Sequence, residues 1–500
     1  MSRIPFVSLA RALPARVDDW VNPIVVKELR QAVRGRTAAA MLSFFLFVET
    51  ATLGFALLRS QLLSEASGGA LGEGTRAFSI LLGVLLGTAF LFVPVATWFR
   101  MTSERNDQNL DLLFVTTLTP GEIASGKLLA GGFLTLWLFS ASLPFLTFTY
   151  FLRGVDFFTV LVLLSIGYLG VLAATQVALL AATVPGTKVF RALVALLALW
   201  GVVTIATLTI ASSIALLSSG AMVLFVSRDA RIAAVVMLAT FTSLFAVARV
   251  LTTACLTPQV ANRARPVRLT FSVIWVLALG GSYALALLAS DGEVFAVGLW
   301  GTYAILALTL LAAASERDRL GPRVLREVPA GARRLLAFPF FSGAASGLSW
   351  SVLVAALTTL FGTFARAYLP TRGTDDVERA LVAGPGVLAY ILCYALTGRF
   401  LRERFLGNRV SEGHTWVISL LLAVAASVLP VLVGVFGLSA HEQPRSLFPW
   451  LVLNPFSVLD AQHAPVYVTI GATLALLSVF PKIRWFLAKV REFRKPGDAA

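Results

Sequence analysis

One stretch of the chain has the residue spacing of a phosphate-binding loop. Gly121-Glu-Ile-Ala-Ser-Gly126-Lys127 matches the glycines and lysine with which such a loop holds nucleotide phosphates. The next residue is Leu128, where that loop needs a serine or threonine to hold magnesium. An apolar stretch follows, and no strand precedes the glycines. We therefore discount ATP hydrolysis by this chain and expect no catalytic residue in it.

Other residue types that support catalysis or metal binding are scattered. His414, His441 and His463 lack the spacing of metal ligands, and no cysteine or carboxylate completes a ligand set. Cys255 and Cys393 lie at a helix end and inside an apolar segment, which argues against a disulfide. We expect no metal site, and no cofactor bound by this chain itself.

Glu49 lies near the middle of an apolar segment. An ionised group there costs at least ~2.5 kcal/mol, so it should face the protein interior, a partner or water. Gln176, in another apolar segment, is a candidate partner. Two interpretations stay open: a protonated packing residue, or a residue that lines a translocation path together with Gln176.

The composition indicates the solvent around the elements that carry these residues. The chain is 58% hydrophobic and only 13% charged, with a mean hydropathy of +0.84, so a bilayer must surround most of it. A helical crossing needs ~20 apolar residues. Twelve segments reach that length, near 38–58, 77–99, 128–151, 157–183, 192–217, 232–254, 269–290, 294–314, 348–366, 380–398, 416–438 and 465–481. We expect an all-α polytopic membrane protein with about 12 transmembrane helices.

Lysine and arginine indicate the orientation. With both termini cytoplasmic, the inside segments contain 32 of the 41 basic residues, as the positive-inside rule requires. The formal charge of +15 then needs no nucleic-acid partner, because basic loops facing anionic membrane lipids explain it.

The N-terminal sequence and the residue usage bear on localisation. The first 20 residues lack an apolar core long enough for a cleavable signal peptide. No N-x-S/T sequon occurs, and arginine far outnumbers lysine. These features favour a bacterial inner (plasma) membrane.

Residues 21–36 have a helical pattern ahead of the first span. Val25 and Leu29 share one face while Lys27 and Arg30 share the other, which is typical of a helix in the membrane interface. Pro23 suits a helix start. The helix is either a simple anchor or an elbow that transmits movement to the spans.

The polar segment 100–127 separates two apolar stretches. Leu110, Leu113 and Phe114 fall on one helical face beside Asp111. A short amphipathic helix with this pattern could insert into a groove on a cytoplasmic partner. The alternative is a solvated loop whose apolar residues rest on the membrane surface.

These two polar segments resemble the permease subunits of ATP-binding-cassette (ABC) exporters of the type-2 class. The N-terminal motif matches at Asn22, Pro23, Lys27, Glu28 and Arg30. The loop that couples such permeases to their ATPase matches at Glu104, Arg105, Leu110, Asp111, Leu113, Phe114, Pro120, Gly126 and Lys127. Two departures are Gln108, where the family usually has glycine, and Thr117, where it often has proline.

The resemblance covers roughly residues 22–268 and implies a function. Such a permease moves a substrate across the inner membrane while a separate cytoplasmic P-loop ATPase subunit binds ATP and magnesium. It also implies membrane lipids as surroundings, and self-association or a second permease subunit as further partners.

The resemblance and the spans together predict the domain organisation. Residues 1–37 form a cytoplasmic N-terminus, 38–268 a six-span permease-like domain, 269–481 a second six-span domain, and 482–500 a basic cytoplasmic tail. Ser315-Glu316-Arg317 repeats Ser103-Glu104-Arg105 after the second span of its half, which hints at duplication.

Glycine pairs indicate where spans can pack closely. Gly83 and Gly87 form one GxxxG pair, and Gly343 and Gly347 form another. This spacing allows two helices to approach each other within a membrane.

Two other functions compete with the exporter. An ion-gradient-driven secondary transporter with 12 spans often has two six-span repeats and buried charges at mid-membrane. A non-transporting membrane scaffold could share the same fold, because fold alone does not determine activity.

Overall fold

The computed structural model of this chain describes residues 23–34, 36–67, 73–106, 119–151, 155–258, 261–318, 320–369, 372–407, 410–437, 450–460 and 463–494. Within these ranges the ordered elements are helices, and no β-strand occurs. Twelve of the helices are long and apolar enough to cross a bilayer. The chain is therefore an all-α polytopic membrane protein, and the sequence-based prediction of this fold class is confirmed.

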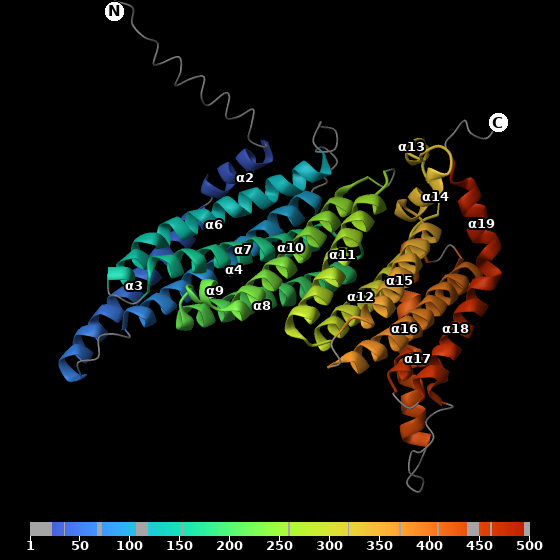
Figure 1. The fold of residues 1–500 in the computed structure, drawn as a ribbon. Coiled ribbons are helices and arrows are strands. Elements are labelled where there is room, and N and C mark those ends of the chain that lie inside the picture. Colours follow the sequence, from blue (N-terminus) through green and yellow to red (C-terminus); the bar gives the residue numbers. More distant parts are fainter. Residues whose placement is uncertain are drawn as a thin grey trace, which may run out of the picture. The chain divides into compact units, whose positions relative to one another are not determined.

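The helices fall into two compact units, residues Met1–Thr257 (unit 1) and Pro258–Ala500 (unit 2). The helices of unit 1 are α2 (Pro23–Arg34), α3 (Arg36–Ser67), α4 (Glu73–Asn106), α6 (Pro120–Phe151), α7 (Phe157–Thr183), α8 (Lys188–Ser219), the short α9 (Val223–Val226) and α10 (Arg228–Leu256). Six of them, all except α2 and α9, have the length and hydropathy of spans (Figure 1).

Unit 2 contains six further spans and several short helices. Its α-helices are α11 (Ala264–Ala289), α12 (Glu293–Ala313), α13 (Pro322–Arg326), α14 (Arg333–Ala337), α15 (Ala344–Arg366), α16 (Thr374–Leu401), α17 (Thr415–Gly437), α18 (Ala464–Val479) and α19 (Ile483–Glu492). A π-helical turn, η3 (Arg402–Leu406), extends α16, and 3₁₀ turns are η2 (Phe338–Phe340), η5 (Glu412–His414), η6 (Trp450–Leu453), η7 (Pro455–Leu459) and η8 (Phe480–Lys482).

Polar residues determine where several spans begin. Asp156 accepts a hydrogen bond from the Thr159 amide at the start of α7. Thr187 and Ser227 cap α8 and α10 in the same way. Such caps satisfy amides of the first turn that have no carbonyl partner within the helix, so the spans begin where the sequence changes from polar to apolar.

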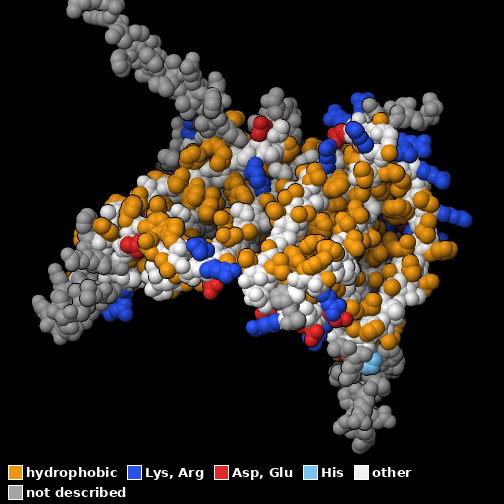
Figure 2. Space-filling view, in the orientation of Figure 1, with side chains coloured by type: hydrophobic (Ala, Val, Ile, Leu, Met, Phe, Trp, Pro, Cys, Tyr) orange, Lys and Arg blue, Asp and Glu red, His pale blue; other side chains and the backbone are white. Residues whose placement is uncertain are grey.

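The core of unit 1 is built around α4. This helix packs against α3, α6, α7 and α8, and Phe78, Leu81 and Leu85 on it are fully buried. Outward-facing residues on the same helix are also apolar, as Leu91 at 72% exposure shows. Figure 2 shows such hydrophobic side chains covering the spans, as expected for a protein dissolved in lipid.

The core of unit 2 is built around α16, which packs against α12, α15, α17 and α18. Tyr390 of α16 is completely buried, and its hydroxyl donates to the carbonyl oxygen of Val452 at 2.8 Å. A buried tyrosine in a membrane protein needs such a partner, since lipid offers none.

Gly384 of α16 lies against Tyr303 of α12, and we expect Gly384→Ala to lower the free energy of unfolding by ~1–3 kcal/mol. A Cβ at this position would lie 2.2 Å from Cδ2 of the Tyr303 ring, and Tyr303 is itself 3% exposed. Gly301→Ala on α12 is the control, because no atom lies within 4 Å of its Cβ position. Unfolding of both variants in mixed detergent micelles measures the difference. Equal stability of the two variants would contradict this packing.

Candidate functional site

Helix α2 packs along α6 at one end of unit 1 (Figure 1). The helix starts at Pro23, and its inner face buries Ile24 and Val25. Below this face lies an apolar cluster drawn from α2, α4, α6, α7 and α10. Its members are Ile24, Met101, Ile123, Ala124, Leu179, Ala182 and Leu256. The cluster fixes α2 to the ends of four spans.

Five charged residues link α2, α4 and α6, and we call this group the junction: Lys27, Glu28, Arg100, Glu104 and Lys127. Lys127 Nζ of α6 lies 2.7 Å from Glu28 Oε1 and 2.7 Å from Glu104 Oε2. Lys27 Nζ lies 2.7 Å from Glu104 Oε1, and Arg100 Nη1 lies 3.4 Å from Glu28 Oε2. Each glutamate therefore contacts two bases, and α2 is tied by charge to both α4 and α6.

Burial makes these contacts energetically important. The side chains of Lys127 and Glu28 are only 3% and 4% exposed, and that of Glu104 is 15% exposed. A buried charge must be paired, because its removal from water costs several kcal/mol. Two acids face three bases, so the junction keeps a positive excess on the side of Lys27, whose side chain is 47% exposed. The pattern of α2 predicts the apolar face of the helix but not the buried Glu28 within it.

The structure corrects the extent of the polar loop. The sequence suggests one polar segment over 100–127, yet α4 continues to Asn106 and α6 begins at Pro120. A capping box explains the early start of α6. The Thr119 amide donates to Glu122 Oε2 at 2.7 Å, and the Glu122 amide donates to Thr119 Oγ1 at 3.3 Å.

Because of this cap, Lys127, the lysine of the phosphate-loop-like sequence, lies within a helix. Gly121 to Lys127 is helical, so its amides do not form a loop around a phosphate. The Lys127 ammonium is directed to the carboxylates of Glu28 and Glu104. Gly126, the neighbouring residue of the motif, is also buried.

Arg105 binds the end of another span. Its Nη1 donates to the carbonyl oxygens of Ala182, at 3.2 Å, and Val184, at 2.6 Å, where α7 ends. Carbonyls in the last turn of a helix lack partners within it, and a cation there is favourable. Ser103-Glu104-Arg105 thus joins α4 to α2 and α6 through Glu104, and to α7 through Arg105.

The remaining predicted residues of these two motifs fall into two groups. Arg30 is an exposed residue of α2. Five others lie outside the described residues, and their roles stay predictions: Asn22, Leu110, Asp111, Leu113 and Phe114.

Glu49 and Gln176 are both fully buried, but they have different partners. Ser142 Oγ of α6 donates to Glu49 Oε1 at 3.1 Å, and Gln176 Nε2 donates to Thr252 Oγ1 of α10 at 2.9 Å. The pairing of Glu49 with Gln176 considered from the sequence is therefore not present. Glu49 Oε2 and Gln176 Oε1 have no hydrogen-bond partner among the described residues.

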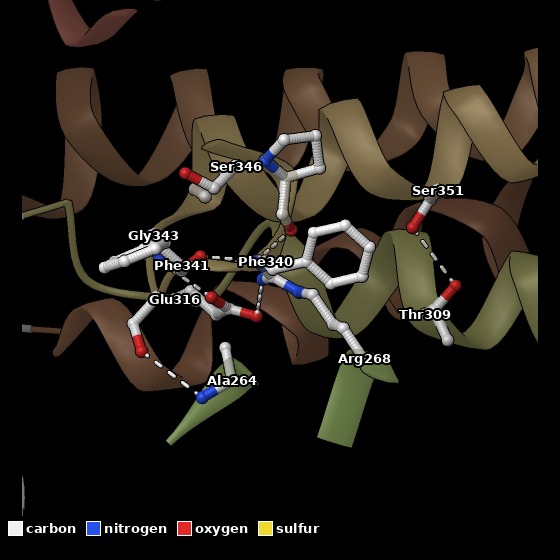
Figure 3. Close-up of polar contacts among 12 residues, drawn as sticks. Ala264, Arg268, Thr309, Glu316, Phe340, Phe341, Gly343, Ser346 and Ser351 are labelled. Carbon is white, nitrogen blue, oxygen red and sulfur yellow. Dashed lines mark hydrogen bonds and ion pairs between the residues drawn. The ribbon is translucent and has the colours of Figure 1, made fainter. Parts of the chain in front are cut away.

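A second charged cluster, in unit 2, is centred on the repeated Ser315-Glu316-Arg317. Glu316 Oε1 lies 2.5 Å from Arg268 Nη2 at the start of α11, and Glu316 Oε2 accepts from the Gly343 amide before α15. Arg268 Nη1 also donates to the carbonyl oxygens of Pro339 and Phe341 (Figure 3).

The two clusters have a common plan. In unit 1, Glu104 at the end of the second span contacts α2, ahead of the first span, and α6, the third span. In unit 2, Glu316 after the second span contacts the first span, α11, and the residue before the third span, α15. Sequence reasoning missed Arg268 as a site residue. The repeated Ser-Glu-Arg was the available signal, because Arg268 at the first span of its half pairs with Glu316 as Lys27, ahead of the first span, pairs with Glu104.

A metal site has no support within the described ranges, where no group of three His, Cys, Asp or Glu residues is placed to hold an ion. The two cysteines are free thiols.

Comparison with known proteins adds no relative. No family model, no curated protein and no solved structure matches this chain.

Proposed function

We propose that this chain is the membrane subunit of an ABC exporter of the type-2 class. It moves a substrate outward across a bacterial inner membrane, and a separate cytoplasmic P-loop ATPase that binds ATP and magnesium supplies the energy. Both termini then lie in the cytoplasm. The observation that carries the proposal is the junction, because its ion pairs join the two sequence motifs that resemble this family across 77 residues (Lys27 with Glu104) and 99 residues (Glu28 with Lys127).

The junction suits the transmission of movement. Residues 107–118 connect α4 and α6 directly, so a partner that displaces them also displaces the ends of both helices. Separating α2 from these ends would break the buried pairs of Lys127 with Glu28 and Glu104, and breaking a buried pair costs ~3–5 kcal/mol. Helices α2, α4 and α6 would therefore move together. Helix α3 begins two residues after α2 ends, so α2 would pass the motion to α3.

The partner surface is proposed to include the exposed Lys27 and Arg30 together with residues 107–118. Two exposed bases, together with the apolar residues Leu110, Leu113 and Phe114 of this segment, would suit a groove with apolar walls and an acidic rim. Such a groove would belong to the ATPase subunit.

The test is purification of the tagged full chain in mild detergent, followed by identification of stoichiometric partners and an ATPase assay. The variant Leu110→Ala/Leu113→Ala/Phe114→Ala is expected to lose a P-loop ATPase that the wild type retains. Leu335→Ala/Leu336→Ala is the control, since these α14 side chains are 55% and 79% exposed in unit 2. Absence of any ATPase from the wild type would favour the secondary transporter or the scaffold.

A secondary transporter is the second candidate, and Glu49 favours it. One oxygen of this buried carboxyl group has no partner among the described residues, as in a site that binds and releases a proton.

Glu49→Gln separates the two functions. Glutamine keeps an oxygen that can accept from Ser142, so we expect the free energy of unfolding to change by less than about 1 kcal/mol. The exporter should keep ATP-driven transport in this variant, as measured in proteoliposomes. Proton coupling would instead be supported if an imposed pH gradient drives transport by the wild type but drives none by Glu49→Gln.

A further inference from the structure

Unit 2 contains a cavity of about 340 Å³ at the start of α15. Its apolar walls include Leu325 of α13, Phe338 of η2 and Phe493, which directly follows α19. These side chains belong to one small buried cluster, so the walls are held in place by packing. The volume lies within the range of small-molecule sites.

The lining of this cavity includes a serine hydroxyl. Ser346, in the first turn of α15, lines the cavity and is 3% exposed. Its hydroxyl makes no hydrogen bond with any described residue, and Figure 3 shows it directed away from the Arg268 cluster with no dashed line. The hydroxyl is therefore available to a molecule that enters the cavity.

The amides beside Ser346 favour an anionic group. The Gly343 amide donates to Glu316 Oε2, and the Ala344 amide donates to Asp318 Oδ1. The amides of Ala345 and Ser346 follow in the same first turn, where no helix carbonyl precedes them as an acceptor. Amides at a helix start together with a hydroxyl form a typical phosphate-binding group.

The mouth of the cavity has one charge of each sign. Lys489 and Glu492 of α19 both line it, and their side chains form an ion pair at 2.6 Å. Asp318 also lines the cavity, but its Oδ2 already accepts from Arg399 and, at 3.2 Å, from Trp485 Nε1. Glu492, 63% exposed, is therefore the acid that can turn to a ligand.

This arrangement discriminates between ligand charges. A purely anionic ligand would face Glu492 and Asp318, and a purely cationic ligand would face Lys489 and the start of α15. A zwitterion matches both ends. Its phosphate would accept from Ser346 and Lys489, while its ammonium group would donate to Glu492.

The position of the cavity indicates where such a molecule comes from. It lies where the span α15 begins, beside α19, which directly continues the last span through η8. Lysine and arginine side chains gather around α13, α14 and α19 (Figure 2), as is usual at a membrane interface. The apolar walls would cover the glycerol and the upper acyl chains of a lipid.

We propose that this cavity binds the headgroup of a zwitterionic amino-phospholipid, with phosphoethanolamine as the recognised chemistry. The site is in unit 2 and involves none of the junction residues. If the cavity does not bind this lipid, the proposed exporter function is unaffected.

The test is native mass spectrometry of the full chain released from nanodiscs that contain equal amounts of phosphatidylethanolamine, phosphatidylcholine and phosphatidylglycerol. The wild type is expected to retain phosphatidylethanolamine. Lys489→Gln and Ser346→Ala should each reduce its retention, Lys489→Gln by about ten-fold because a charge-assisted hydrogen bond is lost. Glu492→Gln should shift the preference toward phosphatidylglycerol, since the acid that favours an ammonium group is gone.

Matched controls separate recognition from loss of structure. Arg484→Gln removes an exposed base from the same helix, and Ser349→Ala removes a hydroxyl that donates to the Ser346 carbonyl. Both should retain phosphatidylethanolamine like the wild type. If free phosphoethanolamine displaces the lipid, the headgroup alone suffices for binding. If the lipid stays bound in the presence of free phosphoethanolamine, the acyl chains contribute to binding as well. Equal retention of all three lipids, or equal phosphatidylethanolamine retention in every variant, would overturn the proposal.

Discussion

Lys127→Met is expected to lower the free energy of unfolding by ~3–5 kcal/mol, because it removes one partner of buried ion pairs. The change leaves Glu28 buried with only Arg100 at 3.4 Å, and it leaves Glu104 with only Lys27. Methionine has a similar length and is apolar, so the loss reflects the missing charge and not a cavity. Unfolding of the purified chain by increasing SDS in mixed micelles measures the effect.

Two further variants show whether the junction causes this loss. Lys188→Met removes a lysine that also begins a span but is exposed, and it should be nearly neutral. Lys127→Met/Glu28→Gln removes the stranded charge as well, so it should recover part of the stability. If Lys127→Met is as stable as Lys188→Met, the junction does not hold α2 to the spans.

Arg268→Met is expected to have a comparable effect, ~3–5 kcal/mol, in unit 2. Arg268 is 5% exposed. Its guanidinium group pairs with Glu316 and donates to the carbonyl oxygens of Pro339 and Phe341. Removal leaves the Glu316 carboxylate without its base, with the Gly343 amide as its remaining donor, and it takes the Arg268 donor away from the carbonyl oxygens of Pro339 and Phe341.

Arg265→Met is the matched control, because Arg265 is exposed on the same first turns of α11. Hydrogen exchange of α15 and of residues 338–343 should increase in Arg268→Met and remain unchanged in Arg265→Met. Wild-type protection in both variants would contradict a role for Arg268 in holding this turn.

The spans could be predicted from the sequence because a bilayer leaves only one local solution. An apolar stretch of about 20 residues in lipid must satisfy its own backbone hydrogen bonds, and a helix does so. The residues at which the spans begin and end depend less on hydropathy than on capping side chains. The third span was expected from residue 128, but α6 begins at Pro120 because Thr119 and Glu122 cap it.

Close packing between spans depends on which face meets a neighbour, and spacing alone does not show this. Gly347 does lie against another helix, since a Cβ there would meet Ala313 of α12 at 2.6 Å. Gly83 and Gly87 have the same GxxxG spacing, yet no described atom lies within 4 Å of either Cβ position.

The charged contacts of the site were the least predictable part. Glu28 and Lys127 are 99 residues apart, and each belongs to a segment that reads as polar and solvated. Their pairing depends on how α2 packs against α6, which no local pattern encodes. The motif residues were found because the chain resembles a family, whereas their mutual contacts emerged only from the fold.

The most direct test of the exporter assignment is photo-crosslinking from the proposed docking segment in intact membranes. A photoreactive phenylalanine analogue at Phe114 is compared with the same analogue at Phe157, a 71%-exposed residue at the start of α7. We expect that position 114 alone crosslinks to a protein with P-loop ATPase motifs, and that added nucleotide changes the yield. A position-114 product without such a protein, or the same product from both positions, would contradict it.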